Sequence, residues 1–485
     1  MKHRYCFLGA LIFLLALRFL HFGTAIDAPH DWRQCDTAYY IRDFYENGID
    51  LLHPAVCWMG ASDTLALEFP LPEAIATLAY QCTGGESIPL ARAVFLCFFM
   101  VALFYFYKIV CLLFGKQLAQ WATLVYLVLP LSIYYSRAVH IDFSAVASAH
   151  AMVYYFLLGV QEKRRRYMAA SGLAAVFVFL IKPPYAFYFS LPMLAYAASS
   201  KQLKWVLRQA FWYLPVVVAF WLWQKHVNAI NGAAPNLDYI LHYRKMTQHA
   251  GWYFGTLQQR LSLYPWWILL QRGVLEVAGA VGFVFFLLGW RGFQALPNRH
   301  FLLFWMLGLA LYVLLFFNLN FVHNYYQIPL LAPVAVLAAR GIRSISPSRP
   351  WMKWLLLGLL LLANWMYCEK YYYEVAADHV EIGTLIRENT PDTALVIVSY
   401  NTMDCRNPKI LYRARRRGWS VEEAAIKPEV IRRLQQEQRA RYWAYAGPPL
   451  EQKGMEDYLK TLPPPRVFNL NSISQPLYIF DLTTK

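Results

Sequence analysis

Six ionisable side chains stand beside apolar or aromatic neighbours, where a simple solvated role explains them poorly. These are the acids Asp36, Glu68 and Asp142 and the bases Lys182, Arg137 and His323. A carboxylate in such a place can take a proton from a hydroxyl group, and a cation can stabilise a departing phosphate. The three acids together with His323 could also hold a divalent ion, Mg²⁺ or Mn²⁺. Taken singly, each residue could equally be an interfacial or snorkelling side chain, so only their convergence is informative.

Asp36 has the most suggestive neighbourhood. It lies in the run HDWRQCDTAYY, residues 30–40, shortly after the first apolar stretch. Tyr39 and Tyr40 follow at spacings of three and four residues, which places them one turn along if this run is helical. Glu68 begins the run EFPLP further along the same polar segment. We therefore expect a polar centre built around Asp36.

The composition indicates a chain dissolved mainly in lipid. Hydrophobic residues make up 58% of the chain and charged residues only 15%, well below the share of a soluble domain. The net charge is +16, but the last 117 residues are nearly neutral, and most basic residues stand in short clusters between apolar runs. This distribution fits membrane orientation and argues against nucleic-acid binding.

The apolar runs predict about eleven transmembrane helices. Their ranges are 5–26, 89–113, 118–136, 143–160, 168–181, 185–199, 206–225, 266–289, 301–318, 325–340 and 354–368. With a cytoplasmic N-terminus, alternate connections carry the clustered Lys and Arg, which is the positive-inside pattern. We expect a multi-pass protein of the plasma (inner) membrane whose C-terminal segment lies outside the cytoplasm.

The candidate residues fall in the connections of the opposite side. The first of these, 27–88, holds ten acidic residues and two basic ones, Arg33 and Arg42. Shorter connections carry Arg137 and Asp142, then Lys182, and then His323. Ionisable groups next to hydrocarbon are costly and suggest function, so we expect these residues at one leaflet.

The predicted architecture is an α-helical polytopic membrane protein with a small C-terminal α/β domain. We assign 1–368 to the transmembrane domain, with 27–88 as its first extracytoplasmic loop, and 369–485 to the second domain. In the latter, 395–398 and 477–482 read as strands and 427–441 as an amphipathic helix. Four cysteines, Cys35, Cys57, Cys82 and Cys405, fall in predicted outer segments, where a disulfide is an option without a preferred pair.

At these residues the chain resembles the GT-C glycosyltransferases, in the branch of protein O-mannosyltransferases and the lipid A aminoarabinose transferase. Asp36-Thr37-Ala38-Tyr39-Tyr40 is similar to their acidic residue, small residue and paired tyrosines after the first span. The lead-in Trp32-Arg33-Gln34, the stretch at Glu68 and the segment from His323 to Pro329 with Tyr325 and Tyr326 also fit. Thr37 departs from the Asp-Glu pair of many mannosyltransferases, which leaves the acceptor class open.

The resemblance implies an inverting transferase that uses a polyprenyl-phosphate sugar and a protein, lipid or glycan acceptor. It implies Asp36 as the base or as an acid that orients the acceptor, with Glu68, Asp142 and His323 as supporting or metal-contacting residues. It further implies contacts to the donor phosphate from Lys182, Arg92, Arg137 and His323. The remaining implied substrate contacts are Trp32, Arg33, Gln34, Tyr39, Tyr40, Tyr325 and Tyr326.

Two other interpretations stay open at this point. A secondary transporter would place polar sites at mid-membrane and often shows repeated halves, whereas these spans are nearly free of charge apart from Arg272 and Glu276. An O-antigen polymerase or ligase would carry its key residues in a large late loop, whereas the long loop here comes first.

Overall fold

The chain divides into two compact units. The computed structural model describes residues 2–61, 64–234, 237, 240, 250–345, 349–401, 405–450 and 454–483. The first unit, here called the helical unit, comprises Met1–Thr24, Ser87–Lys225 and Met246–Tyr373. The second, the mixed unit, comprises Ala25–Glu86, His226–Lys245 and Glu374–Lys485. The predicted loop 27–88 thus groups with the C-terminal segment rather than with the helices that flank it in sequence.

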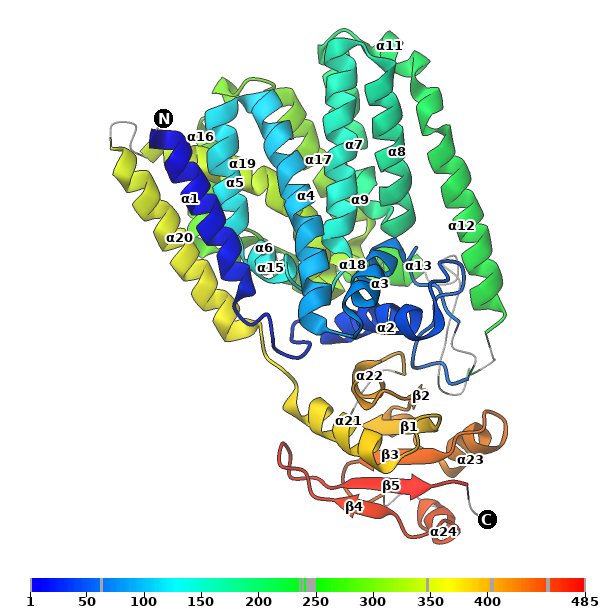
Figure 1. Cartoon of the computed structure of the whole chain (residues 1–485). Helices are drawn as coiled ribbons and strands as arrows, with labels where there is room; N and C mark the ends of the chain where they lie inside the picture. Colours follow the sequence, from blue (N-terminus) through cyan, green and yellow to red (C-terminus); the bar gives the residue numbers. More distant parts are fainter. Residues whose placement is uncertain are drawn as a thin grey trace. The chain divides into compact units, whose positions relative to one another are not determined.

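Helices build the helical unit almost entirely (Figure 1). Each of the eleven predicted apolar runs falls on one or more of them. They are α1 (Lys2–Ala16), η1 (Leu17–Phe19), α4 (Ile88–Phe114), α5 (Lys116–Val128), α6 (Pro130–Tyr135), α7 (Asp142–Glu162), α8 (Arg165–Ile181), α9 (Pro184–Phe187), α10 (Ser190–Ser199), α11 (Leu203–Arg208), η2 (Ala210–Tyr213), α12 (Leu214–Gly232), α13 (Ala250–Phe254), α14 (Leu257–Leu261), α15 (Leu263–Arg272), η4 (Gly273–Ala278), α16 (Ala280–Arg291), η5 (Phe293–Ala295), α17 (Arg299–Leu315), α18 (Phe317–Val322), η6 (Asn324–Leu330), α19 (Leu331–Ile345) and α20 (Pro350–Tyr371).

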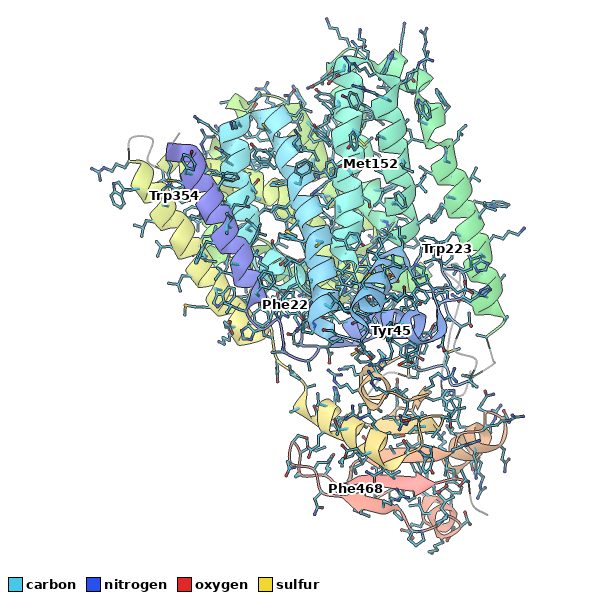
Figure 2. The ribbon with its side chains drawn as sticks, viewed as in Figure 1. Phe22, Tyr45, Met152, Trp223, Trp354 and Phe468 are labelled. Carbon is cyan, nitrogen blue, oxygen red and sulfur yellow. The ribbon has the colours of Figure 1, made fainter. Side chains whose placement is uncertain are left out.

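Four helical segments among the described residues are long and apolar enough to cross a bilayer. They are Ile88–Phe114, Asp142–Glu162, Asn324–Ile345 and Trp351–Tyr371, and a fifth arises if the bent pair α15–η4 and α16 counts as one. On the last segment, Trp354 packs against Trp121 of α5 with 4.9 Å between ring centroids (Figure 2). The other predicted runs fold as shorter helices.

Two predicted spans are interrupted in the structure. The span predicted at 266–289 is wrong as a straight helix, because the chain bends by 90° between Leu263–Ala278 and Ala280–Arg291. Gly279 forms this break with φ +72°, a conformation that side chains with a Cβ rarely adopt. The run predicted at 118–136 divides into α5 and α6, since Pro130 opens a new helix after Leu129 turns extended.

Polar and basic connections lie at opposite ends of the helical unit. Figure 1 shows the turns α4–α5 and α7–α8 at one end, and the start of α7 and the end of α8 at the other. The first pair of turns carries Lys116 and the run Lys163–Arg166. The other end carries Asp142 and Lys182. The side chains of Lys2 and Arg4, which also belong to the predicted basic side, lie outside the described part.

The mixed unit contains one sheet with its helices (Figure 1). The strand order is β2-β1-β3-β5-β4, in which β1 pairs in parallel with β2 and β3, and β5 runs antiparallel to β3 and β4. The indoles of Trp419 and Trp443 are fully buried in it. Its elements are α2 (Asp31–Asn47), α3 (Leu71–Thr83), α21 (Ala377–Asn389), β1 (Leu395–Tyr400), α22 (Lys409–Ala414), β2 (Arg417–Ser420), η7 (Glu423–Ala425), α23 (Pro428–Gln436), β3 (Tyr442–Ala446), α24 (Met455–Lys460), β4 (Arg466–Phe468) and β5 (Leu477–Asp481).

The predicted α/β character of the C-terminal segment is confirmed. The predicted strands coincide with β1 and β5, and the predicted helix coincides with α23, although α23 ends five residues early at Gln436. None of the eight cysteines is in a disulfide. The option of a disulfide among the outer cysteines is therefore not realised in the structure.

Candidate active site

The helical unit holds a buried ion pair between Asp142 and Lys182. Lys182 Nζ donates to Asp142 Oδ1 at 2.7 Å, and His140 Nδ1 lies 2.6 Å from Asp142 Oδ2. The hydroxyl of Tyr185 also donates to Asp142 Oδ1. Asp142 has no exposed surface and Lys182 is 4% exposed. We call Asp142, Lys182, His140 and Tyr185 the Asp142 cluster.

Local sequence explains why these charges stand where they do. Asp142 is the first residue of α7, where the helix dipole favours an anion, and Lys182 follows the last residue of α8, where the dipole favours a cation. The two helices are antiparallel neighbours joined by a short turn at Lys163 and Arg164. Asp142 at the start of α7 therefore lies close to Lys182, which directly follows the end of α8.

Aromatic rings surround the Lys182 ammonium. Its nitrogen lies 4.9 Å from the ring centroid of Tyr185, 4.7 Å from that of Tyr325 and 4.2 Å from that of Tyr326. The His323 ring stacks on Tyr325 with 5.0 Å between centroids and an 11° interplanar angle. The structure thus brings four predicted site residues, Lys182, Tyr325, Tyr326 and His323, to the Asp142 cluster, where ring faces stabilise the buried cation.

Arg92 and Arg137, two predicted phosphate ligands, lie against the chain that follows α1 and η1. Arg92 Nη1 donates to the carbonyl oxygens of Phe22 and Thr24, both at 2.7 Å. The Arg137 guanidinium covers the Tyr373 ring at 4.5 Å, and its Nη1 donates to the His21 carbonyl at 3.4 Å. Both side chains are buried. These contacts hold both arginines against the segment that follows η1 and, for Arg137, against Tyr373.

The mixed unit contains the second cluster, centred on Asp36 of α2. The indole of Trp58 donates to Asp36 Oδ1 at 3.0 Å, and Asp36 is 2% exposed. Burial raises the pKa of Asp36 to about 7, although the Arg33 guanidinium and the Trp58 hydrogen bond act to lower it. Arg33, one turn earlier on α2, forms an ion pair with Glu68. We call Asp36, Trp58, Arg33 and Glu68 the Asp36 cluster.

The other predicted residues of α2 hold the same unit together. Gln34 Nε2 donates to the Asp27 carbonyl at 2.7 Å, and the Tyr40 hydroxyl donates to the Leu65 carbonyl at 2.7 Å. Tyr39 is buried and Trp32 is half-buried. The chain ends this helix at Gly48, whose positive φ of 96° suits glycine and whose N–H caps the Phe44 carbonyl.

The predicted metal ligands do not fit a divalent cation as they are placed. Among the residues that the structure describes, no group of three or more His, Cys, Asp and Glu side chains could hold a metal ion. The Asp142 oxygens face Lys182, His140 and Tyr185, and Glu68 faces Arg33. A cation would have to displace these positive or hydrogen-bonding partners.

Three members of the two clusters, and the nearby acid Glu73, are not among the residues predicted from the sequence. His140 and Tyr185 stand two residues before Asp142 and three after Lys182, so their spacing could have suggested them. Trp58 is 22 residues from Asp36, and nothing local links the two. Glu73 of α3 is 3% exposed, and burial raises its pKa to about 8. It was overlooked as one acid among ten in the first loop.

The two clusters belong to different units. Residues 68–227 match the family model described as dolichyl-phosphate-mannose-protein mannosyltransferase. No curated protein sequence matches the chain.

Solved structures similar to this one cover nearly the whole chain. ArnT from Cupriavidus metallidurans, in a crystal structure bound to undecaprenyl phosphate, has a TM-score of 0.65 at 14% identity and covers 99% of this chain and 98% of its own. The archaeal oligosaccharyltransferase AglB from Archaeoglobus fulgidus, in complex with an inhibitory peptide and a dolichol-phosphate, has a TM-score of 0.54 at 11% identity over 92% of this chain and 70% of its own. The mycobacterial arabinofuranosyltransferase AftD has a TM-score of 0.53 at 12% identity over 99% of this chain and 42% of its own. The predicted resemblance is confirmed, and the chain has the fold of the GT-C superfamily of membrane glycosyltransferases.

Proposed function

We propose that this protein is a membrane glycosyltransferase that moves a sugar from a polyprenyl-phosphate donor to an acceptor hydroxyl at the extracytoplasmic face. The observation that carries the proposal is the state of Asp36. A buried carboxyl group with a pKa of about 7 and a defined hydrogen-bond donor has the properties of a general base at neutral pH. The fold and the family match supply the reaction class in which such a base is needed.

In the proposed reaction, the acceptor oxygen attacks the anomeric carbon of the donor sugar. The bond from that carbon to the phosphate oxygen breaks, and the polyprenyl phosphate leaves with the electron pair. Asp36 takes the acceptor proton as the new glycosidic bond forms. A single displacement of this kind inverts the anomeric configuration, and correct placement of the hydroxyl supplies much of the rate.

Lys182 is proposed to meet the negative charge of the phosphate. Asp142 supplies a counter-charge to this buried ammonium, and the rings of Tyr185, Tyr325 and Tyr326 limit where it can lie. A fixed cation costs little reorganisation when charge develops on the leaving group. Arg92, Arg137 and His323 are proposed to support this end of the helical unit rather than to bind phosphate directly.

We further propose that the helical unit lies in the plasma (inner) membrane with a cytoplasmic N-terminus and about eleven crossings. Its outer helices expose apolar side chains, as in Leu355, Leu359 and Leu362 of α20 and Val217 and Val218 of α12. Exposed leucine and valine at this density suit lipid and not water. The basic connections at one end match the positive-inside rule, which would place Asp142 and Lys182 at the extracytoplasmic end.

The test is release of free polyprenyl phosphate by purified protein in lipid bilayers. A panel of polyprenyl-phosphate sugars would be offered with a membrane extract as acceptor. Wild type and Asp50→Asn should turn over one donor, because Asp50 is exposed and pairs with His53 and not with a residue of the Asp36 cluster. Asp36→Asn should lose about 10²- to 10⁴-fold in kcat. Equal turnover by Asp36→Asn would remove Asp36 from the chemistry, and no turnover of any donor would overturn the proposal.

Treatment with a chelator tests whether the reaction requires a metal ion. Because the predicted ligands face cations and hydrogen-bond donors, wild type should keep its turnover after EDTA treatment. Loss on chelation and recovery on adding Mg²⁺ or Mn²⁺ would show that these side chains rearrange to hold an ion.

A further inference from the structure

We propose that helix α22 and strand β2 of the C-terminal segment position Asp36 for proton transfer. In this inference, which rests on the proposed function, Lys409 and Arg413 are positioning residues that act through α2. The C-terminal segment is then part of the catalytic apparatus. All the residues concerned belong to the mixed unit.

The first contact holds the N-terminal end of α2. Lys409 Nζ lies 3.3 Å from Asp31 Oδ1, and Arg413 Nη2 lies 3.6 Å from Asp31 Oδ2. Arg413 also donates to the Ile26 carbonyl at 3.1 Å and to Cys35 Sγ at 3.7 Å. Cys35 is the residue next to Asp36. One face of α22 therefore contacts α2 both at its first residue and beside the proposed base.

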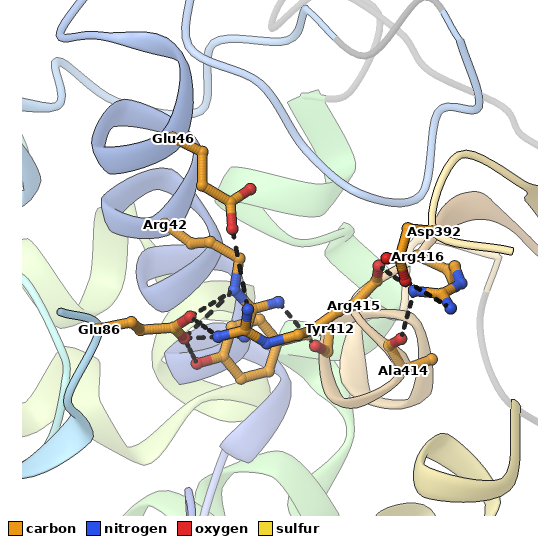
Figure 3. A network of polar contacts seen from close by, with 8 residues as sticks. All are labelled: Arg42, Glu46, Glu86, Asp392, Tyr412, Ala414, Arg415 and Arg416. Atoms are coloured by element: carbon orange, nitrogen blue, oxygen red, sulfur yellow. Dashed lines mark hydrogen bonds and ion pairs between the residues drawn. The ribbon is translucent and has the colours of Figure 1, made fainter. Parts of the chain in front are cut away.

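The second contact holds α2 on the C-terminal side of Asp36, at Arg42 (Figure 3). Arg42 Nη1 donates to the Tyr412 carbonyl at 2.8 Å, and its guanidinium lies 4.0 Å from the centroid of the Tyr412 ring. Glu86 accepts from Arg42 Nη2 at 2.9 Å and also pairs with Arg415. Asp36 lies between Asp31 and Arg42 on α2. Contacts on both sides of it restrict how far this helix can shift.

The third contact fixes Trp58, the hydrogen-bond donor to Asp36. The N–H of Gly418 in β2 donates to the Cys57 carbonyl at 2.9 Å, and the N–H of Gly60 donates to the Gly418 carbonyl at 2.9 Å. These two bonds hold the chain just before Trp58, at Cys57, and just after it, at Gly60. Gly60 also lies so close to Trp419 that an added Cβ would be 2.0 Å from its ring. The donor and the acceptor of the Trp58–Asp36 bond are thus both held by the segment 409–419.

The same contacts account for two unusual charge runs of the sequence. The first loop is strongly acidic, and residues 413–417 read Arg-Ala-Arg-Arg-Arg. In the structure Arg413 pairs with Asp31, Arg415 with Glu86 and Glu46, and Arg416 with Asp392. Three of the four arginines of this run are thus paired inside the unit, which supports a role in the fold. The Arg413–Asp31 pair is largely shielded from solvent, and such a pair costs most when one partner is removed.

The experiment compares kcat, KM and the pH dependence of polyprenyl-phosphate release in full-length variants. Lys409→Met/Arg413→Met removes both cations from Asp31, and Lys409→Arg keeps the charge. Arg433→Met is the matched control, because Arg433 is an exposed cation of α23 that pairs with Glu437 in the same unit. The expected result is a loss of about 10²-fold in kcat for the double variant with little change in KM, since a small misplacement of the base is enough. Lys409→Arg should keep most of the wild-type rate, and Arg433→Met should match wild type.

The pH profile separates positioning from simple unfolding. The charged and titratable groups around Asp36 are Arg33, Glu68, Tyr40, Cys35 and Cys57. The double variant substitutes none of them. When α2 loosens and water reaches Asp36, the midpoint of the acid limb should fall below its wild-type value. If the double variant does not fold, Lys409→Met alone carries the test, since Arg413 still contacts Asp31, and the same changes should appear at smaller size. Wild-type kcat and midpoint in a folded variant, with Asp36→Asn still inactive, would overturn the positioning role and leave the proposed function standing. No turnover by wild type would overturn both.

Discussion

Asp36 accepts one hydrogen bond from Trp58 and is otherwise shut off from water. Burial outweighs the attraction of Arg33, so its carboxyl group holds a proton up to about neutral pH. Asp142 is equally buried but faces Lys182 and His140. Two carboxylates of one chain are therefore suited to different tasks, one to exchange a proton and the other to orient a cation.

The pH dependence of the rate follows from the state of Asp36. A general base works only when deprotonated, so kcat/KM should rise with pH and level off above a midpoint near the pKa of about 7. The measurement is polyprenyl-phosphate release across the neutral range. A rate that stays constant down to the ordinary range of aspartate would contradict the role of Asp36.

The stability of Asp36→Asn provides the accompanying control. The folded protein holds the Asp36 proton more tightly than the unfolded chain, whose pKa is 3.8. The stability that this proton contributes is complete below pH 3.8 and is lost as the pH rises to about 7. At mildly alkaline pH, wild type must keep an ionised carboxylate buried at this position, whereas asparagine is neutral. The variant should therefore melt at the same or a higher temperature than wild type at that pH. A lower melting temperature would mean that its lost activity reflects misfolding.

The Asp142–Lys182 pair should behave as a coupled unit in unfolding experiments. Asp142→Asn leaves the buried Lys182 without its counter-charge, which we expect to cost about 3–5 kcal/mol. Asp142→Asn/Lys182→Met removes both charges and should cost less than the sum of the two single changes. Thermal unfolding of the four proteins in lipid measures this coupling. Additive effects would show that the two side chains do not depend on each other.

At the scale of elements, the break between η4 and α16 decides where several polar groups lie. Glu276 of η4 accepts from Asn324 Nδ2 at 2.5 Å and from the Tyr372 hydroxyl at 2.8 Å. Asn324 in turn accepts from the Tyr135 hydroxyl at 2.6 Å. A straight helix through 266–289 would carry its second half in another direction. The π-helical turn and the bend after it are typical of functional or strained regions.

Gly279 is the residue that this break requires. Gly279→Ala would place a Cβ 1.9 Å from Asn364 Oδ1 at a positive φ, so it should cost roughly 1–3 kcal/mol of stability. Gly273→Ala is the matched control, because its Cβ meets nothing within 4 Å and the backbone there is helical. Its effect should stay within about 0.5 kcal/mol. Equal melting temperatures for the two variants would contradict the strain at Gly279.

At the scale of the whole molecule, the mixed unit is assembled from segments that lie far apart in the chain. Arg42 of the first loop contacts Tyr412, 370 residues later in the chain. A chain ended after Tyr373 would keep α2 but lose α22, which contacts it, and β2, which holds the segment around Trp58. Hydrogen exchange should then show faster exchange of the α2 amides, because the surfaces that cover them are gone.

The helical unit supplies the internal reference for that experiment. Helix α7 contacts α4 and α8 of its own unit, so its amides should exchange at the wild-type rate in the shortened chain. Equal protection of α2 in the shortened and full chains would show that the first loop folds without the C-terminal segment.

Local composition is sufficient for much of the architecture. Long apolar runs form helices wherever they stand, because only helices satisfy the backbone polar groups inside lipid. The eleven apolar runs were therefore predictable as helices. Two of the strands and α23 were predictable from their own residue patterns, and the grouping of Asp142, Lys182 and His323 at one end followed from the order of the runs. Gly279 was harder to recognise, since an isolated glycine inside an apolar run does not reveal a positive φ or a 90° bend.

Pairings across long stretches of chain could not be predicted in this way. Nothing near Asp36 in sequence points to Trp58, and nothing in the run 413–417 points to Asp31 and Glu86. Which acid stays ionised and which keeps its proton depends on burial and on the cations that the fold brings to it. Composition and periodicity therefore identify a largely helical, apolar chain and its candidate residues, while the three-dimensional contacts alone give Asp36 and Asp142 their separate surroundings.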